Sequence, residues 1–126
     1  MKLLVPLLLG IVLVTGCAAG NSSSETTTTT VSSGSDIKEF EMTAKQFEFV
    51  PSTITVNEGD TVRLRITSTD VDHGFSIPAF AVNAQLSVGE TKDIEFVADK
   101  KGTYTFACSV MCGSGHSGMK GTLVVE

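Results

Sequence analysis

Residues 53–67 read TITVNEGDTVRLRIT, and this stretch decides the fold class. From Val62 to Thr67 apolar and polar residues alternate, which is the period of a strand with one buried face. The Asn57–Asp60 segment before it has the composition of a turn. We therefore expect two strands here, over residues 53–57 and 61–69.

The same local pattern continues through the rest of the chain from Asp36. Candidate strands cover residues 37–44, 53–57, 61–69, 74–78, 91–97, 102–107 and 120–125. Short strands with regular turn signals and no convincing helical segment predict an antiparallel sandwich or barrel. Residues 36–126 have the length of one domain of modest size. Phe47, Phe49 and Phe80 are interpreted as core residues.

The charge of the chain is mildly acidic. The chain has nine Lys and Arg and fourteen Asp and Glu, which gives a formal net charge of −5. The sequence contains no run of basic residues. Nucleic-acid binding needs a clustered basic face, so that class of partner is not expected. An acidic surface would suit a basic protein partner.

The N-terminus has the pattern of an export signal. One lysine precedes an apolar run from Leu3 to Val14, which is shorter than the roughly 20 residues that span a bilayer. The run ends in Val14-Thr15-Gly16-Cys17, which resembles the lipobox of bacterial lipoproteins. That resemblance implies a signal peptide over residues 1–16 and a lipidated Cys17; the alternative is an ordinary signal peptide with an incidental cysteine. Residues 17–35 then form a Ser/Thr-rich tether too polar to fold by itself.

Candidate metal ligands gather in the segment Cys108–Met119, which reads CSVMCGSGHSGM. It contains Cys108, Cys112, His116 and Met119, and its three interleaved glycines let a short loop bend tightly. The other histidine of the chain, His73, lies in the loop-like stretch DVDHGFSIP. Both histidines and two of the three cysteines therefore fit one hypothetical site.

Three interpretations of this segment compete. A disulfide between Cys108 and Cys112 suits an oxidising compartment, but it leaves His116 and Met119 unexplained. Two cysteines and two histidines suit structural zinc, which has no need of the methionine. Thiolate and imidazole with a weak thioether ligand are typical of copper electron-transfer centres, and we favour this interpretation.

The copper interpretation has two forms. A mononuclear blue-type centre would use Cys112, His116, Met119 and His73, and would leave Cys108 idle beside the metal. Two thiolates four residues apart can instead bridge two copper ions, each completed by one histidine.

At this point the chain resembles a known family. The pattern Cys-x3-Cys-x3-His-x2-Met, preceded by DVDHGF and followed by GTLVV, is similar to the dinuclear CuA domain of subunit II of haem–copper oxidases, and nitrous-oxide reductases carry a similar domain. The resemblance covers most of residues 45–126, including FEFVPSTITVNEGDTV. It implies an all-β, cupredoxin-like Greek-key β-sandwich.

The resemblance also implies the role of each ligand. Cys108 and Cys112 would be bridging thiolates, His73 and His116 terminal imidazoles, and Met119 a weak axial ligand. The other axial ligand would be the backbone carbonyl of Val110.

Two features depart from the family pattern. Val110 stands where oxidase subunits usually carry a glutamate. A lipid and a polar tether replace the usual transmembrane helices before the domain.

The function implied is single-electron transfer through two copper ions in a respiratory chain, without bond-making catalysis. We expect an extracytoplasmic, membrane-anchored lipoprotein with a cytochrome c-like donor and an oxidase-type acceptor. Copper delivery for oxidase maturation and a mononuclear blue-copper carrier are the alternatives.

Overall fold

The computed structural model describes residues 35–126, and almost all of their regular structure is β. Nine strands follow one another in chain order: β1 Ile37–Lys45, β2 Glu48–Val50, β3 Thr53–Val56, β4 Thr61–Ser68, β5 His73–Ile77, β6 Val82–Leu86, β7 Thr91–Val97, β8 Gly102–Ala107 and β9 Lys120–Val125. Two single-turn 3-10 helices, Pro78–Phe80 and His116–Gly118, lie between strands.

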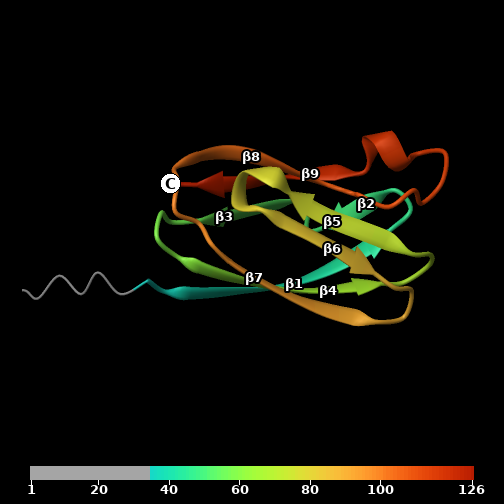
Figure 1. The fold of residues 1–126 in the computed structure, drawn as a ribbon, viewed down its shortest axis with the longest axis horizontal. Helices are drawn as coiled ribbons and strands as arrows, with labels where there is room; N and C mark the ends of the chain where they lie inside the picture. The colour runs from blue at the N-terminus through green and yellow to red at the C-terminus, as the bar shows by residue number, and fades with distance from the viewer. Residues whose placement is uncertain (1–34) are drawn as a thin grey trace, which may run out of the picture. The chain divides into compact units, whose positions relative to one another are not determined.

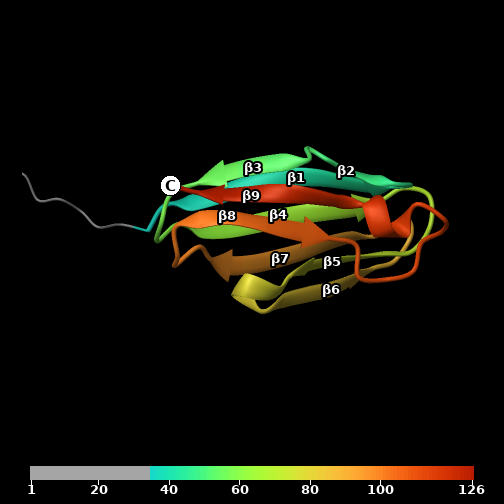
Figure 2. The same cartoon turned by 90° about the horizontal axis from the view of Figure 1, so that it is seen from above.

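The strands form two sheets packed face to face (Figures 1 and 2). One sheet has the order β2-β1-β4-β7 and the other the order β3-β9-β8-β5-β6. The predicted sandwich is confirmed, and most of its strand pairs are antiparallel as expected. The prediction was wrong for two pairs: β1 pairs with β4 in parallel, and so does β3 with β9. Alternation along a strand shows which face is buried and carries no information on the direction of the neighbouring strand.

The alternating residues of β4 build the centre of the core. Val62, Leu64 and Ile66 are fully buried between the sheets. Phe49 packs edge-on against Phe75, with ring centroids 5.5 Å apart, and against Phe106 at the same distance. Interlocked aromatic rings fill the space between the sheets and make that interior rigid.

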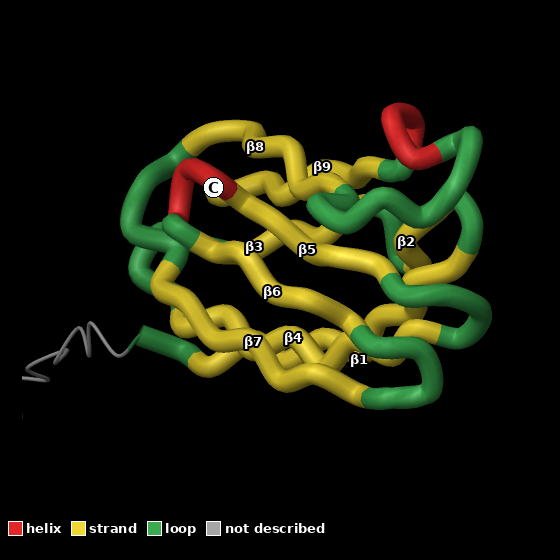
Figure 3. The backbone as a smooth tube through the Cα atoms, turned by 45° about the vertical axis from the view of Figure 1, so that its right-hand side comes forward, coloured by secondary structure: helices red, strands yellow, loops and turns green. Residues whose placement is uncertain are grey.

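Two strands were missed by the sequence pattern, and one residue was misplaced. β2 has only three residues, too few to show a period of two (Figure 3). β6 does alternate, with Val82 and Leu86 buried and Asn83 and Gln85 exposed, but it has only five residues and follows β5 after one short turn. His73, expected in a loop, is the first residue of β5 and pairs with Leu86 of β6. Its ring is therefore fixed by a sheet.

The segment with the candidate ligands connects β8 to β9 at one end of the sandwich. Figure 1 shows it at the end opposite the C-terminus, where the β1–β2 turn and the β4–β5 connection also lie. Here we call residues 108–119 the ligand loop. Three connections far apart in the sequence thus meet at this end.

The segments predicted to be a signal peptide, a lipidated Cys17 and nearly all of the tether lie outside the described residues. Within residues 35–126, no helix is long and apolar enough to cross a membrane.

Candidate metal centre

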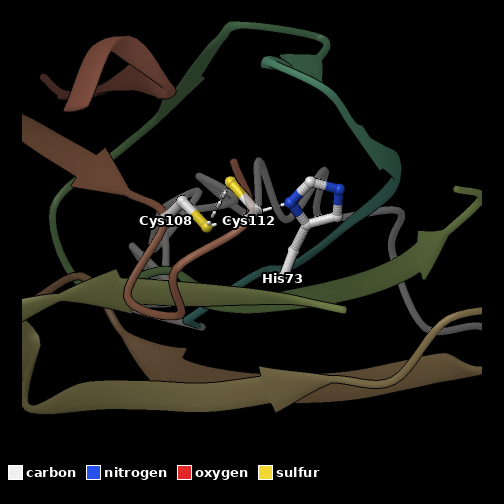
Figure 4. Close-up of side chains that lie close together, drawn as sticks. All are labelled: His73, Cys108 and Cys112. Atoms are coloured by element: carbon white, nitrogen blue, oxygen red, sulfur yellow. Dashed lines mark hydrogen bonds between the residues drawn. The ribbon is translucent and has the colours of Figure 1, made fainter. Parts of the chain in front are cut away.

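Five side chains and one carbonyl of the predicted ligand set come together. The Sγ atoms of Cys108 and Cys112 are 3.6 Å apart, as separate thiols (Figure 4). His73 approaches Cys108 from one side, with 3.8 Å between its Nδ1 and the sulfur. The Cys108 thiol donates a hydrogen bond to the carbonyl of Val110 at 3.1 Å.

The other two donors lie beside Cys112. Its sulfur is 3.6 Å from Nδ1 of His116 and 3.8 Å from Sδ of Met119. The donor atoms therefore form a continuous series in which each thiol touches a different histidine. Every residue of the predicted set is found at one place.

The site is buried on one side and partly open on the other. His73 is completely buried, and Met119, Cys112 and Cys108 keep at most 7% of their surface exposed. His116 is only partly buried, in a short turn flanked by exposed serines and glycines. His73 therefore has the drier surroundings, and His116 reaches the surface.

Backbone hydrogen bonds hold the ligand loop closed. The amide of Cys108 donates to the carbonyl of Met119 at 3.0 Å, where β8 ends and β9 is about to begin. Within the loop, the amide of His116 donates to the carbonyl of Gly113 at 3.1 Å. The first and last ligands of the loop thus sit side by side, one residue beyond the paired ends of β8 and β9.

Asp70 orients the buried histidine, a role that the sequence analysis did not assign. Nε2 of His73 lies 2.8 Å from Oδ1 of Asp70, which leaves Nδ1 directed at Cys108. Burial by itself would raise the pKa of Asp70, but hydrogen bonds from the Gln46 amide, His73 and the Val71 amide outweigh it and lower the pKa. An ionised carboxylate that accepts the Nε2 proton selects the tautomer in which Nδ1 can bind a metal. An aspartate three residues before the histidine was the signal available in the sequence.

Two glycines allow the loop to approach its supports. A Cβ on Gly74 would collide with Ser109, which lies directly over β5. A Cβ on Gly115 would collide with the ring of Phe47 from the β1–β2 turn. Phe47, expected only in the core, is partly buried and also supports the ligand loop.

Burial keeps the metal-free thiol of Cys112 protonated. Burial, and to a smaller extent the hydrogen bond from Cys108, raise the pKa of this group to about 11. Because the thiolate is the form that binds metal, loading must remove this proton. A soft metal that binds thiolate strongly can offset the free energy needed to remove this proton.

The chemistry of the donor set fits copper. The two thiols and the thioether are the soft ligands that Cu(I) and mixed-valence copper prefer, and the two imidazole nitrogens also suit copper. The carbonyl is a harder, weaker donor. The ligating atoms of His73, Cys108 and Cys112 all lie within 4.8 Å of one another, so a small ion can contact them without rearrangement of the backbone.

Comparison with known proteins identifies the family of the chain. The profile of the cupredoxin-like domain matches residues 7–125. The chain belongs to the cupredoxin-like family. With the His73–Cys108–Cys112 cluster, this membership makes the chain a copper-binding domain.

This cupredoxin is similar to oxidase subunits and reductases. It is 32% identical to cytochrome c oxidase subunit 2 of Thermus thermophilus over 96 residues, which cover 76% of this chain and 71% of the relative. It is 34% identical to nitrous-oxide reductase of Stutzerimonas stutzeri over 76% of this chain, but spans only 16% of that enzyme.

A solved structure of a haem–copper terminal oxidase dimer contains a chain with the same fold. The match has a TM-score of 0.65 at 27% identity and covers 76% of this chain and 68% of the other. The predicted kinship with oxidase subunit II domains is thereby confirmed for this cupredoxin.

Proposed function

We propose that this cupredoxin transfers single electrons through a dinuclear copper centre. Cys108 and Cys112 would bridge the two ions, and His73 and His116 would each complete one of them. Met119 and the carbonyl of Val110 would be weak axial ligands. Bound copper would supply a site that accepts and releases one electron.

The position of Cys108 is the observation that carries this proposal. A mononuclear centre built on Cys112, His116 and Met119 would need only one thiol. Cys108 is nevertheless buried between His73 and Cys112, with its sulfur within 4 Å of both. An idle thiol beside copper would be open to oxidation, whereas a second thiolate ligand is protected by its metal bonds.

The surroundings of the ligands suit electron transfer better than catalysis. His73 is held by Asp70 and by its place in β5, and the paired strands β8 and β9 of the same sheet hold the two ends of the ligand loop. Ligands fixed in this way change little when the charge of a bound ion changes. Both histidines of the chain belong to the centre, so neither is free to act as a general base.

The place and partners in this proposal follow from the similarity to oxidase subunits and from the N-terminal sequence. A lipid on Cys17 would hold the domain on the extracytoplasmic side of a membrane, and the tether would let it turn. The electron donor would be a cytochrome c-like protein, and the acceptor would be an oxidase-type complex.

Metal counting and electron paramagnetic resonance of the copper-loaded chain test the proposal. We expect two coppers per chain and a seven-line hyperfine pattern, because one unpaired electron would be shared by two nuclei. A four-line pattern with one copper in fully loaded protein would contradict it. Reversible reduction with copper retained, rather than lost to a competing apo-site, separates electron transfer from copper delivery.

A further inference from the structure

One residue of the β1–β2 turn connects the two halves of the metal centre. The side-chain amide of Gln46 donates a hydrogen bond from Nε2 to the carbonyl of Cys112 at 2.6 Å. Its backbone N–H donates to Oδ2 of Asp70, also at 2.6 Å. Gln46 therefore reaches two segments that are 66 and 24 residues away in the sequence.

Both partners of Gln46 act directly on predicted ligands. The second oxygen of Asp70 holds His73 at 2.8 Å. The sulfur of Cys112 lies 3.6 Å from both the sulfur of Cys108 and Nδ1 of His116. A displacement of Gln46 would thus change the separation between the buried imidazole and the thiols.

Packing of the neighbouring residue reinforces this contact. The Phe47 ring lies against Gly115, between Cys112 and His116 in the ligand loop. Gln46 itself is exposed, so its side chain contributes little to the apolar core. What the side chain adds at this position is the hydrogen bond to the ligand loop.

We propose that Gln46 is a positioning residue of the metal centre. It holds the peptide of Cys112 against the Asp70–His73 pair, so the ligands keep their spacing before copper binds and while its charge changes. This inference rests on the proposed copper site and deepens it. Hydrogen-bonded supports of this kind commonly control the affinity and electronic properties of a metal site.

The chain offers a matched control for testing this role. Gln46→Met keeps the length of the side chain and removes its hydrogen-bond donor. Gln85, the other glutamine, is exposed on β6, and its side chain has no hydrogen bond among residues 35–126, so Gln85→Met is the control. Gln46→Lys restores a donor, and Gln46→Ala is a second donor-free variant.

The first measurement uses the metal-free full chain in detergent. In Gln46→Met and Gln46→Ala, we expect the amides of Cys108, His116 and Met119 to exchange with deuterium about fivefold faster, the effect of losing one ordinary hydrogen bond. Gln85→Met should exchange like the wild type. Gln46→Lys should recover most of the protection.

The second measurement uses the copper-loaded full chain. We expect the donor-free variants to show altered copper hyperfine splitting, a shifted reduction potential and severalfold faster loss of copper to the Cu(I) chelator bathocuproine disulfonate. Potentials are compared among neutral variants only, because the lysine adds a charge. Gln46→Lys should restore the hyperfine pattern and the slow release.

The inference would be overturned if the donor-free variants matched Gln85→Met in loop exchange, hyperfine pattern and copper release. A lowered melting temperature with these three properties unchanged would also overturn it, since that is a merely structural effect. The wild-type copper count tests the dinuclear proposal separately. If the wild type bound one copper, the dinuclear proposal would fail, but deuterium exchange in the metal-free chain would still test the role of Gln46.

Discussion

The two cysteines of the ligand loop have different neighbours, although both are buried thiols. Cys108 lies beside His73 and the Val110 carbonyl, whereas Cys112 lies beside His116 and Met119. Their chemical type is the same, so any difference between them comes from position. Replacing each cysteine in turn by serine is therefore a sharp test of the site.

We expect Cys108→Ser and Cys112→Ser to give different copper proteins. After Cys108→Ser, the remaining Cys112, His116 and Met119 still meet, and a mononuclear centre with a four-line spectrum can form. After Cys112→Ser, the remaining thiol has only His73 and the Val110 carbonyl beside it, and copper binding should weaken strongly. Indistinguishable spectra and copper affinities for the two variants would contradict this assignment of neighbours.

Asp70→Ala should weaken copper binding by about 10- to 100-fold, the usual effect of losing the partner that orients a histidine ligand. Competition with a chelator of known affinity measures this change. Asp72→Ala is the control, because the Asp72 side chain accepts a hydrogen bond from the Val88 amide at 2.9 Å and, within residues 35–126, makes no hydrogen bond to a predicted ligand. Equal losses in both variants would show that general charge, rather than orientation of His73, controls affinity.

The strands supply the rigidity on which the site depends, and β4 is the central element. It is paired on both edges, with β1 in parallel and with β7 antiparallel, and its apolar residues are completely buried. Removing buried side-chain volume from this strand should therefore destabilise the whole domain.

Leu64→Ala should lower the free energy of unfolding of the metal-free chain by about 2–5 kcal/mol, because it leaves a cavity between tightly packed sheets. Urea unfolding followed by circular dichroism measures the change. Lys92→Ala, an exposed position on the adjacent β7, should change stability by less than about 0.5 kcal/mol. Comparable losses in the two variants would mean that β4 is not the packing centre.

The ligand loop presents the partly exposed His116 at one end of the sandwich, between the exposed residues Ser114 and Ser117. The rate of electron tunnelling falls steeply with distance, so we expect electrons to enter and leave at this end of the sandwich, which is called the port here. Replacing Ser114 or Ser117 by Arg should leave the copper spectrum intact and slow electron exchange with a small redox protein, because changes at the rim act mainly on encounter.

Thr103→Arg is the control for the port. Thr103 is exposed and pairs with Val124 next to the C-terminus, at the other end of the sheet (Figure 1). The substitution Thr103→Arg adds the same arginine side chain far from His116 and should leave the rate of electron exchange unchanged. An unaltered rate in both loop variants would place the port elsewhere.

The chain as a whole combines a copper-binding domain with an N-terminal segment of different composition. The domain matches oxidase subunit II over much of its length, and residues 1–35 have the composition of an export signal followed by a polar tether. Attachment and electron transfer should therefore be separable properties.

Cys17→Ser should move the protein from the membrane fraction to the aqueous fraction without altering its copper spectrum. The expected reason is loss of the lipid, which would be the main source of membrane affinity. Fractionation and mass spectrometry of the N-terminus measure the outcome. Attachment that survives the substitution would show that the apolar segment itself remains as an anchor.

Much of the fold and most of the candidate site could be predicted from the sequence. Strand periodicity identified seven of the nine strands in residues 35–126, because a half-buried strand imposes its alternation on the residues themselves. The ligand loop was equally visible, since four of its donors lie within twelve residues and their chemical types limit the metal.

Strand direction and the supports of the site depended on contacts between distant segments. The parallel pairing of β1 with β4 leaves no local pattern, because side-chain alternation is the same in either direction. Gln46 and Phe47 look like ordinary turn and core residues until the β1–β2 turn is placed against the ligand loop. The reason is physical: a ligand is recognised by its own chemistry, whereas a residue that positions a ligand is defined only by what it touches.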